Sequence, residues 1–269
     1  MRLDDVRGFV FDIDGTLVHR AGAVVHVQPG ALEVLAKIRA SGRPLALFTN
    51  GSEEAPESYA AGLRAAGLEV ADRELLTPLR SVQSYLQMRQ VAGPLQMFAS
   101  DAARDYLDAA GVQLLEAGDD SAPGAVFVAQ ADVVDFDELE RAARAVLAGA
   151  RLLTGSYAPG YAGANGMIIS RGAMLTAALA KASSRRPIVV GKPSRAALRT
   201  ISETLGAPAR TLAVIGDDLG MDIALGRLGG ARTVLVRSGI SGAIDLERLP
   251  ERRRPDAVIG NVGELLDLL

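Results

Sequence analysis

The sequence contains no cysteine, which excludes disulfide bonds and thiolate metal sites. It also lacks any apolar run of the length that a membrane-spanning helix needs. A strong excess of charge is missing too: the formal net charge is −3, so binding to nucleic-acid polymers or to a membrane surface is not indicated. The charged amino-terminal residues show no pattern of a signal peptide. From these absences we expect a cytoplasmic protein.

Hydrophobic residues, by contrast, make up 49% of the 269 residues. A chain of this length and composition can bury one large core or two modest ones. Short apolar runs alternate along it with segments in which apolar residues recur at helical spacing. Such an order is typical of a parallel sheet whose crossover connections are helices. We therefore predict an α/β fold with a Rossmann-like parallel sheet.

The first apolar run, residues 8–11, ends in two carboxylates, Asp12 and Asp14, followed by Gly15. We expect Asp12 at the carboxyl end of the strand and Asp14 just beyond it, where open α/β sheets place their active sites. Neighbouring carboxylates repel each other unless a cation or a shared proton relieves them, so a hard divalent metal suits the pair. The alternative is a strand-end aspartate beside an ordinary Asp-Gly turn, and these residues alone leave both open.

Three further apolar runs end in polar residues. These are Thr49 and Asn50 after residues 45–48, Lys192 after residues 187–190, and Asp217, Asp218 and Asp222 after residues 212–215. Because the carboxyl ends of parallel strands lie at one edge of a sheet, we predict that these groups meet Asp12 there. Such a set suits phosphoryl transfer, in which Asp12 attacks phosphorus and a metal offsets the repulsion. Lys192 and the Thr49 hydroxyl would hold the phosphate oxygens.

The segment between the threonine and the lysine continues to alternate strands and helices, but no strand in it ends in paired carboxylates. We predict that residues 78–186 form an inserted α/β domain and that residues 1–77 and 187–269 form the catalytic core. Within the insertion, Asp101 is expected to cap a helix. Residues 18–28 and the glycine-rich stretch that includes Tyr157–Asn165 are expected to be loops, the second either a flexible excursion or a lid over the substrate.

Four motifs, in order along the whole chain, resemble those of the haloacid dehalogenase (HAD) superfamily of phosphatases. They are Asp12-x-Asp14-Gly-Thr, Thr49-Asn50, Gly191-Lys192-Pro193 and Gly216-Asp217-Asp218-x-x-x-Asp222. The place of the insertion resembles the NagD-like and nitrophenyl-phosphatase subfamily, whose members carry a large α/β cap of type IIA. The resemblance implies the HAD fold with a cap that selects the substrate. It also implies Mg²⁺-dependent hydrolysis of a small phosphomonoester through an aspartyl-phosphate.

The same resemblance implies a role for each matching residue. Asp12 is the expected nucleophile and Asp14 the general acid and base. Mg²⁺ would be bound by the Asp12 side chain, the Asp14 backbone carbonyl and Asp217. The residues expected to bind phosphate are Thr49, Asn50, Gly51 and Lys192. Lys192 would also stabilise Asp12, and Asp222 would position the metal's waters or Lys192.

Several of these residues also have a purely structural interpretation. Lys192 can be a solvated surface group, and Thr49 can cap the next helix. Asp222 can cap a helix without any part in metal binding, and Asp218 faces the same choice, with exposure to solvent favoured. His19 and His26 have no partners at ligand spacing, so we expect them in a loop rather than in catalysis.

The sequence departs from the NagD-like pattern at one point. Where those caps usually carry Thr-Asn-x-Asp, residues 154–157 read Thr-Gly-Ser-Tyr, so substrate specificity does not carry over. The alternatives are an HAD-type phosphotransferase, a non-catalytic phosphate-binding homologue and a receiver-like signalling module. The chain is about twice the length expected of a receiver. The expected partner is a small phosphorylated metabolite, with homodimer formation through the cap as a further possibility.

Overall fold

The computed structural model describes residues 1–21, 24–116, 118–119, 121–163 and 166–269. The chain divides into two compact units. The first consists of residues 1–49, 57–76 and 192–269, and the second of residues 50–56 and 77–191. Among the residues that the structure describes, no helix combines the length and the apolar character needed to cross a bilayer.

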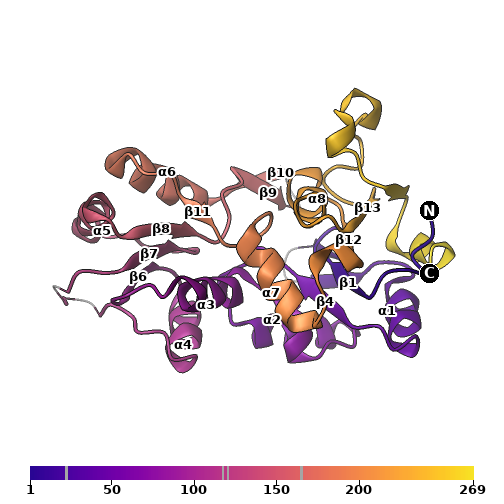
Figure 1. Ribbon diagram of the computed structural model, residues 1–269, viewed down its shortest axis with the longest axis horizontal. Helices are drawn as coiled ribbons and strands as arrows, with labels where there is room; N and C mark the ends of the chain where they lie inside the picture. The colour runs from indigo at the N-terminus through magenta and orange to yellow at the C-terminus, as the bar shows by residue number, and fades with distance from the viewer. Residues whose placement is uncertain (22–23, 117, 120, 164–165) are drawn as a thin grey trace. The chain divides into compact units, whose positions relative to one another are not determined.

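The first unit is built on a six-stranded sheet (Figure 1). Its strands lie in the order β14 (Ala257–Ile259), β13 (Arg232–Val236), β12 (Leu212–Gly216), β1 (Gly8–Phe11), β4 (Leu45–Phe48) and β5 (Leu75–Leu76). All neighbouring strands are parallel. The central strands β12, β1 and β4 are buried along their whole length, which explains why they occur in the sequence as unbroken apolar runs. The predicted α/β class is confirmed.

Successive side chains of these strands enter two cores on opposite faces of the sheet. Phe9 and Phe11 belong to a core shared with α1 (Ala31–Ala40) and α2 (Pro56–Ala65). Val10 belongs to the other, which is shared with α7 (Arg195–Leu205) and α8 (Ala224–Gly229). Short helical segments complete the unit: η1 (Asp72–Glu74), η2 (Ala209–Thr211), η3 (Leu219–Ile223), η4 (Leu246–Arg248), η5 (Glu251–Arg253) and η6 (Val262–Asp267).

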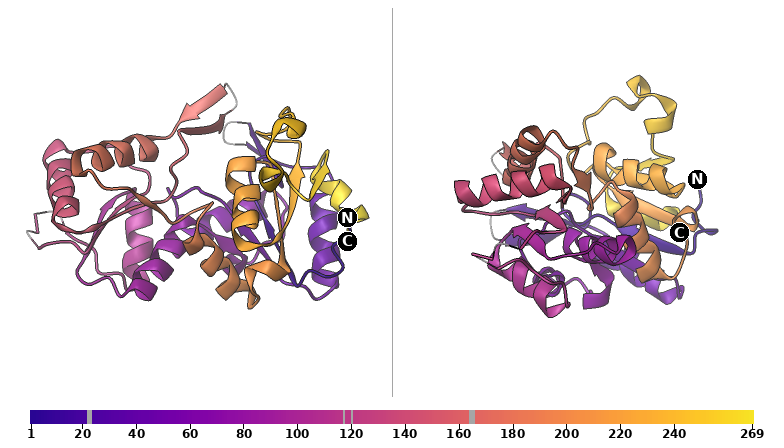
Figure 2. Two further views of the ribbon diagram at one scale, coloured as in Figure 1. Left: turned by 45° about the horizontal axis from the view of Figure 1, so that its top comes forward. Right: turned by 60° about the vertical axis from the view of Figure 1, so that its left-hand side comes forward.

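The second unit has its own parallel sheet of four strands. Their order is β11 (Ile188–Val189), β8 (Arg151–Thr154), β7 (Ala125–Val128) and β6 (Leu95–Phe98). Helices α5 (Phe136–Ala148) and α6 (Arg171–Ser183) lie on one side of this sheet, and α3 (Pro78–Arg89) and α4 (Asp101–Ala109) lie on the other (Figure 2). The sheet and the first pair of helices enclose an apolar core that contains Phe98, Val126 and Leu179.

Hydroxyl and carboxylate side chains cap several helices at their amino-terminal ends. Ser194 accepts a hydrogen bond from the backbone N–H of Ala197 and caps α7. Asp101 does not cap α4, because Ser100 takes that place and accepts from the N–H of Ala103. Asp101 is instead the first residue of the helix, where a carboxylate still suits the helix dipole.

Two segments predicted as loops form antiparallel hairpins. Residues 18–28 contain β2 (Val18–Ala21) and β3 (Val24–Val27), and they place His19 directly opposite His26. The glycine-rich stretch contains β9 (Gly160–Gly163) and β10 (Gly166–Ile169). Strands this short that lack an unbroken apolar run carry too little alternation to be recognised in a sequence. Residues 164 and 165 of the predicted lid, and the side chain of Tyr161, lie outside the described part of the structure.

Strand β11 lies in the second sheet. It pairs with Leu153 and Thr154 of β8, whereas the sequence predicted that residues 187–269 belong to the catalytic core. Only three of the four predicted strand ends, those of β1, β4 and β12, therefore share one sheet edge. Strand β11 has only two residues and stands directly before the Gly-Lys-Pro motif, so its sequence does not indicate which strand it pairs with.

Candidate active site

The ammonium group of Lys192 lies between two aspartates of the first unit. Its Nζ is 2.6 Å from Oδ1 of Asp12 and 2.7 Å from Oδ1 of Asp222. These residues are separated by up to 210 positions in the sequence, and they meet although Lys192 follows a strand of the other sheet. Lys192 reaches Asp12 from the segment that leads into α7, a helix packed on the first sheet.

Asp12 stands at the carboxyl end of β1, as the sequence predicted. Its backbone N–H donates to the carbonyl of Ile215, which continues the ladder between β1 and β12 one residue past the strand. While Lys192 binds one carboxylate oxygen, the hydroxyl of Thr16 lies 3.2 Å from the other, Oδ2. Both oxygens of Asp12 are thus held by donors, so the carboxylate has a fixed direction at the sheet edge.

Lys192 is only 3% exposed, which excludes the solvated surface lysine left open above. Burial by itself lowers the pKa of an amine, but the carboxylates of Asp12 and Asp222 outweigh it and raise the pKa of Lys192. The side chain is therefore a fixed positive charge over the working pH range. Its Nζ also lies 5.8 Å from the ring centroid of Phe48.

Asp217 follows directly after β12 and is held by the loop after β13. The N–H of Ile240 donates to its Oδ2 at 2.7 Å, and its own carbonyl accepts from the N–H of Ser241. The loop can approach this closely only because residue 239 is glycine: a Cβ built there would lie 1.8 Å from the Asp217 Oδ2. The carboxylate is buried and aimed at the cluster.

For Asp218 and Asp222 the sequence left open whether each caps a helix or belongs to the site. Asp218 caps the short π-helix η3 by accepting from the N–H groups of Gly220 and Met221. Asp222 does not cap a helix; it is 1% exposed and binds Lys192, and its second oxygen accepts from the N–H of Asp218. Asp218 is also not the solvent-exposed group that the sequence favoured.

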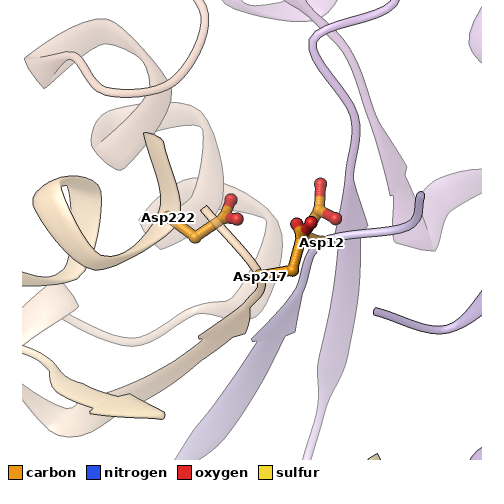
Figure 3. A group of neighbouring side chains, drawn as sticks. All are labelled: Asp12, Asp217 and Asp222. Atoms are coloured by element: carbon orange, nitrogen blue, oxygen red, sulfur yellow. The ribbon is translucent and has the colours of Figure 1, made fainter. Parts of the chain in front are cut away.

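The carboxylates of Asp12, Asp217 and Asp222 face one shared space (Figure 3). Ligand oxygens from all three lie within 4.8 Å of one another. Burial, followed by the nearby acidic groups, raises the pKa of Asp217; burial likewise raises the pKa of Asp222 despite the opposing charge of Lys192. One lysine thus balances incompletely the buried carboxylates of Asp217 and Asp222 and the half-buried carboxylate of Asp12. A divalent cation with oxygen preference fits this donor set and would replace the protons that the raised pKa values of Asp217 and Asp222 favour.

Asp14 points to a different partner from the rest. Its Oδ1 is 2.5 Å from Nε of Arg20 on β2, and both side chains remain partly exposed. Desolvation raises the pKa of Asp14, whereas the charge and hydrogen bond of Arg20 lower it; the net direction is upward. A carboxyl with a raised pKa can hold a proton closer to neutral pH, as an acid that protonates a leaving group must.

The predicted phosphate-binding residues begin where β4 ends. Thr49 is buried at 8% exposure, and its N–H donates to the carbonyl of Leu76. Since β4 is the neighbour of β1, Thr49 emerges at the same sheet edge as Asp12. Asn50 and Gly51 follow it directly in the chain but belong to the second unit, so their approach to a bound phosphate stays a prediction.

Sequence reasoning assigned no function to several groups that hold the cluster in place. Thr16 was part of a motif but received no role, although it is fully buried and binds Asp12. Ile240 acts through its backbone, which leaves no signal in a side-chain pattern. The segment Ser238-Gly-Ile-Ser241 after an apolar run was the available hint, because small residues there permit the close approach to Asp217.

Two family models match the chain in the regions that carry these residues. Residues 9–113 match the model described as haloacid dehalogenase-like hydrolase, and residues 189–265 match one described as HAD-hydrolase-like. The first range includes Asp12, Asp14 and Thr49, and the second includes Lys192 and Asp217.

Curated and solved relatives resemble the chain over nearly its whole length. Ribonucleotide monophosphatase NagD of Escherichia coli K12 is 31% identical, over 97% of this chain and 98% of the relative. Dihydroxyacetone phosphatase of Corynebacterium glutamicum is 28% identical over 96% and 90% of the two chains. The solved p-nitrophenyl phosphatase from Archaeoglobus fulgidus superposes with a TM-score of 0.85 at 26% identity, covering 98% of this chain and 100% of that one.

Proposed function

Because the chain belongs to the haloacid dehalogenase-like hydrolase family, we propose that it is a Mg²⁺-dependent phosphatase that hydrolyses a small phosphomonoester through an aspartyl-phosphate. The observation that carries the proposal is the Lys192 ammonium held between Asp12 and Asp222, with Asp217 beside them. A buried lysine beside three aspartates costs stability, because burying charges that are not fully balanced is unfavourable. Such a cluster is therefore better explained by a catalytic role than by a structural one.

Asp12 is the proposed nucleophile. One of its carboxylate oxygens forms a bond to phosphorus while the bond from phosphorus to the substrate oxygen breaks, which leaves an aspartyl-phosphate and an alcohol. Lys192 and Thr16 hold the carboxylate in one orientation for this attack, and this removes the need to order it during the reaction. The Lys192 charge also offsets negative charge that develops on the equatorial oxygens.

Asp14 is the proposed acid and base. Protonated, it gives its proton to the departing alcohol; ionised, it then takes a proton from the water that attacks the aspartyl-phosphate. That second step releases inorganic phosphate, restores the Asp12 carboxylate and leaves Asp14 protonated for the next cycle. The upward shift in the pKa of Asp14 suits a group that must alternate between both forms.

Mg²⁺ would be held by the side chains of Asp12 and Asp217 and by the backbone carbonyl of Asp14, with Asp222 placing Lys192 and the metal's waters. When bound, it supplies positive charge that lets an anionic phosphate approach the nucleophile. Hard oxygen donors in a buried cluster suit this ion better than a softer metal.

We further propose that the second unit, which contains the predicted insertion of residues 78–186, is the cap that selects the substrate. The relatives at 28–31% identity act on different phosphorylated compounds, a ribonucleotide monophosphate in one and dihydroxyacetone phosphate in the other by their names, so likeness at this level indicates a small phosphorylated metabolite and no single compound. Homodimer formation through this cap and a cytoplasmic location stay predictions from the sequence.

The test is hydrolysis of p-nitrophenyl phosphate by the purified chain. We expect turnover with Mg²⁺, none after chelation, and none in Asp12→Asn, which keeps the shape of the side chain but removes the nucleophilic charge. Asp218→Asn is the matched control, because the side chain of Asp218 caps η3 and an asparagine can keep this cap, so the rate should stay within a few-fold. Turnover that survives in Asp12→Asn would remove the nucleophile assignment.

A further inference from the structure

The second unit contains a cavity at the edge where the strands of its sheet begin. The cavity has a volume of about 770 Å³. Arg151, the first residue of β8, lines it together with Gly124 just before β7 and Ile188 at the start of β11. The opening is therefore framed by the amino ends of three neighbouring strands.

Four arginines line this cavity, and none of the described residues that line it is acidic. They are Arg89 at the end of α3, Arg151 at the start of β8, and Arg185 and Arg186 in the connection from α6 to β11. Across the described ranges of the chain, none of the four forms an ion pair with a carboxylate. A site with four positive charges thus occurs on a chain whose net charge is −3.

Other arginines of the same unit are neutralised by neighbours. Arg144 pairs with Glu140 on α5, and Arg171 at the start of α6 pairs with Asp132. Arg151 donates only to the hydroxyl of Tyr85, which carries no charge. Gathering four guanidinium groups without a described carboxylate partner around one cavity is unfavourable in the free protein, because like charges repel. A ligand with several negative charges would relieve this repulsion.

The chemistry of arginine and the size of the cavity specify the ligand further. A guanidinium group is a planar fork that binds phosphate oxygens through two parallel hydrogen bonds. The volume lies within the range of about 300–1,000 Å³ that encloses a small molecule. Val146, Leu152 and Ile188 supply apolar lining that can pack against the rest of such a molecule.

We propose that this cavity binds a small molecule through a chain of two or more linked phosphates. Its position separates it from the predicted substrate site within the same unit. Asn50, a predicted phosphate-binding residue, lies near Gly191 just past the carboxyl end of β11, whereas Arg151 begins β8 and Arg185 and Arg186 precede β11. A strand of four residues spans about 13 Å, so one phosphate chain does not occupy both edges. The proposal is independent of the phosphatase assignment.

Binding of inorganic tripolyphosphate to the full chain tests the proposal, measured by calorimetry without Mg²⁺ so that no turnover occurs. We expect binding that weakens with added NaCl and that falls about tenfold or more in the double variant Arg185→Gln/Arg186→Gln, since each arginine contributes charge-assisted contacts. The matched control, Arg252→Gln/Arg253→Gln, removes two adjacent exposed arginines from η5 of the first unit and should leave the affinity within about twofold.

Equal affinities in the two double variants, with circular dichroism showing both folded, would overturn the proposal, because any binding then occurs elsewhere. ATP distinguishes the source of the phosphate chain. Tighter binding of ATP than of tripolyphosphate supports the site and assigns the apolar lining to a nucleoside, and equal binding supports it with inorganic polyphosphate as ligand. Preference for a hexaglutamate peptide over both phosphates overturns it in favour of an acidic protein segment.

Discussion

Replacement of Lys192 by methionine should destabilise the protein strongly, even before catalysis is considered. The substitution keeps the approximate length of the side chain but removes the positive charge that Lys192 places between the carboxylates of Asp12 and Asp222. Removing one member of a buried ion pair typically costs about 3–5 kcal/mol, because the remaining charge stays desolvated without a partner. With a urea dependence of about 2–3 kcal/mol per molar, the unfolding midpoint falls by about 1–2 M.

The loss should depend on pH in a definite direction. Burial raises the pKa of Asp222, and Lys192 opposes that shift, so the pKa rises further in Lys192→Met. A carboxyl whose pKa is higher in the folded than in the unfolded state favours folding at low pH and loses this contribution as the pH rises through the folded value. The deficit of the variant should therefore be larger at pH 8 than at pH 5.

A second substitution separates lost charge from lost packing. In Lys192→Met/Asp222→Asn the uncompensated carboxylate of Asp222 is gone, and we expect about 2 kcal/mol or more of stability to return. Lys181→Met serves as the control, because Lys181 is an exposed residue of the last turn of α6. Urea unfolding followed by far-ultraviolet circular dichroism, with chelator present, gives all four midpoints. A double variant no more stable than Lys192→Met would refute the electrostatic account.

Two further substitutions test how the site is held. Gly216→Ala places a Cβ 2.2 Å from Cγ of Asp222, so phosphatase activity should fall by about 100-fold or more because Asp222 can no longer hold Lys192. The control is Gly62→Ala, at an open position of α2. It should leave activity unchanged and alter the free energy of unfolding by no more than about 1 kcal/mol. Arg20→Ala removes the charge that lowers the pKa of Asp14, so the alkaline limb of the pH–kcat profile should move to higher pH, and an unmoved limb would show that this pair does not govern the proton donor.

The parts of the fold that could be predicted from the sequence are those that unbroken apolar runs specify. Strands β1, β4 and β12 are buried on both faces, so each leaves an unbroken hydrophobic run, and the polar residue that follows marks the sheet edge. The positions of Asp12 and Asp217 follow from this logic alone. The distance from Lys192 to both aspartates does not, because it depends on how α7 packs.

The features that sequence reasoning missed are local or are made by the backbone. The β2–β3 hairpin has strands of four residues, too short for a period to be seen. The membership of β11 in the second sheet is decided by its pairing with β8 and not by its own composition. The hydrogen bond from Ile240 to Asp217 uses a backbone N–H that every residue but proline has.

The widened turn of η3 limits which insertions and deletions the sequence can accept around Asp218 and Asp222. Asp218 accepts from the N–H groups of both Asp222 and Ile223, so one extra residue is accommodated in a single turn. Deleting one residue from this segment would swing the following side chains by about 100° around the helix axis. Asp222 would then turn away from Lys192. The number of residues between Asp218 and Asp222 is therefore as tightly constrained as their identity. Natural variants should tolerate substitutions at positions 219–221 far more readily than an insertion or a deletion there.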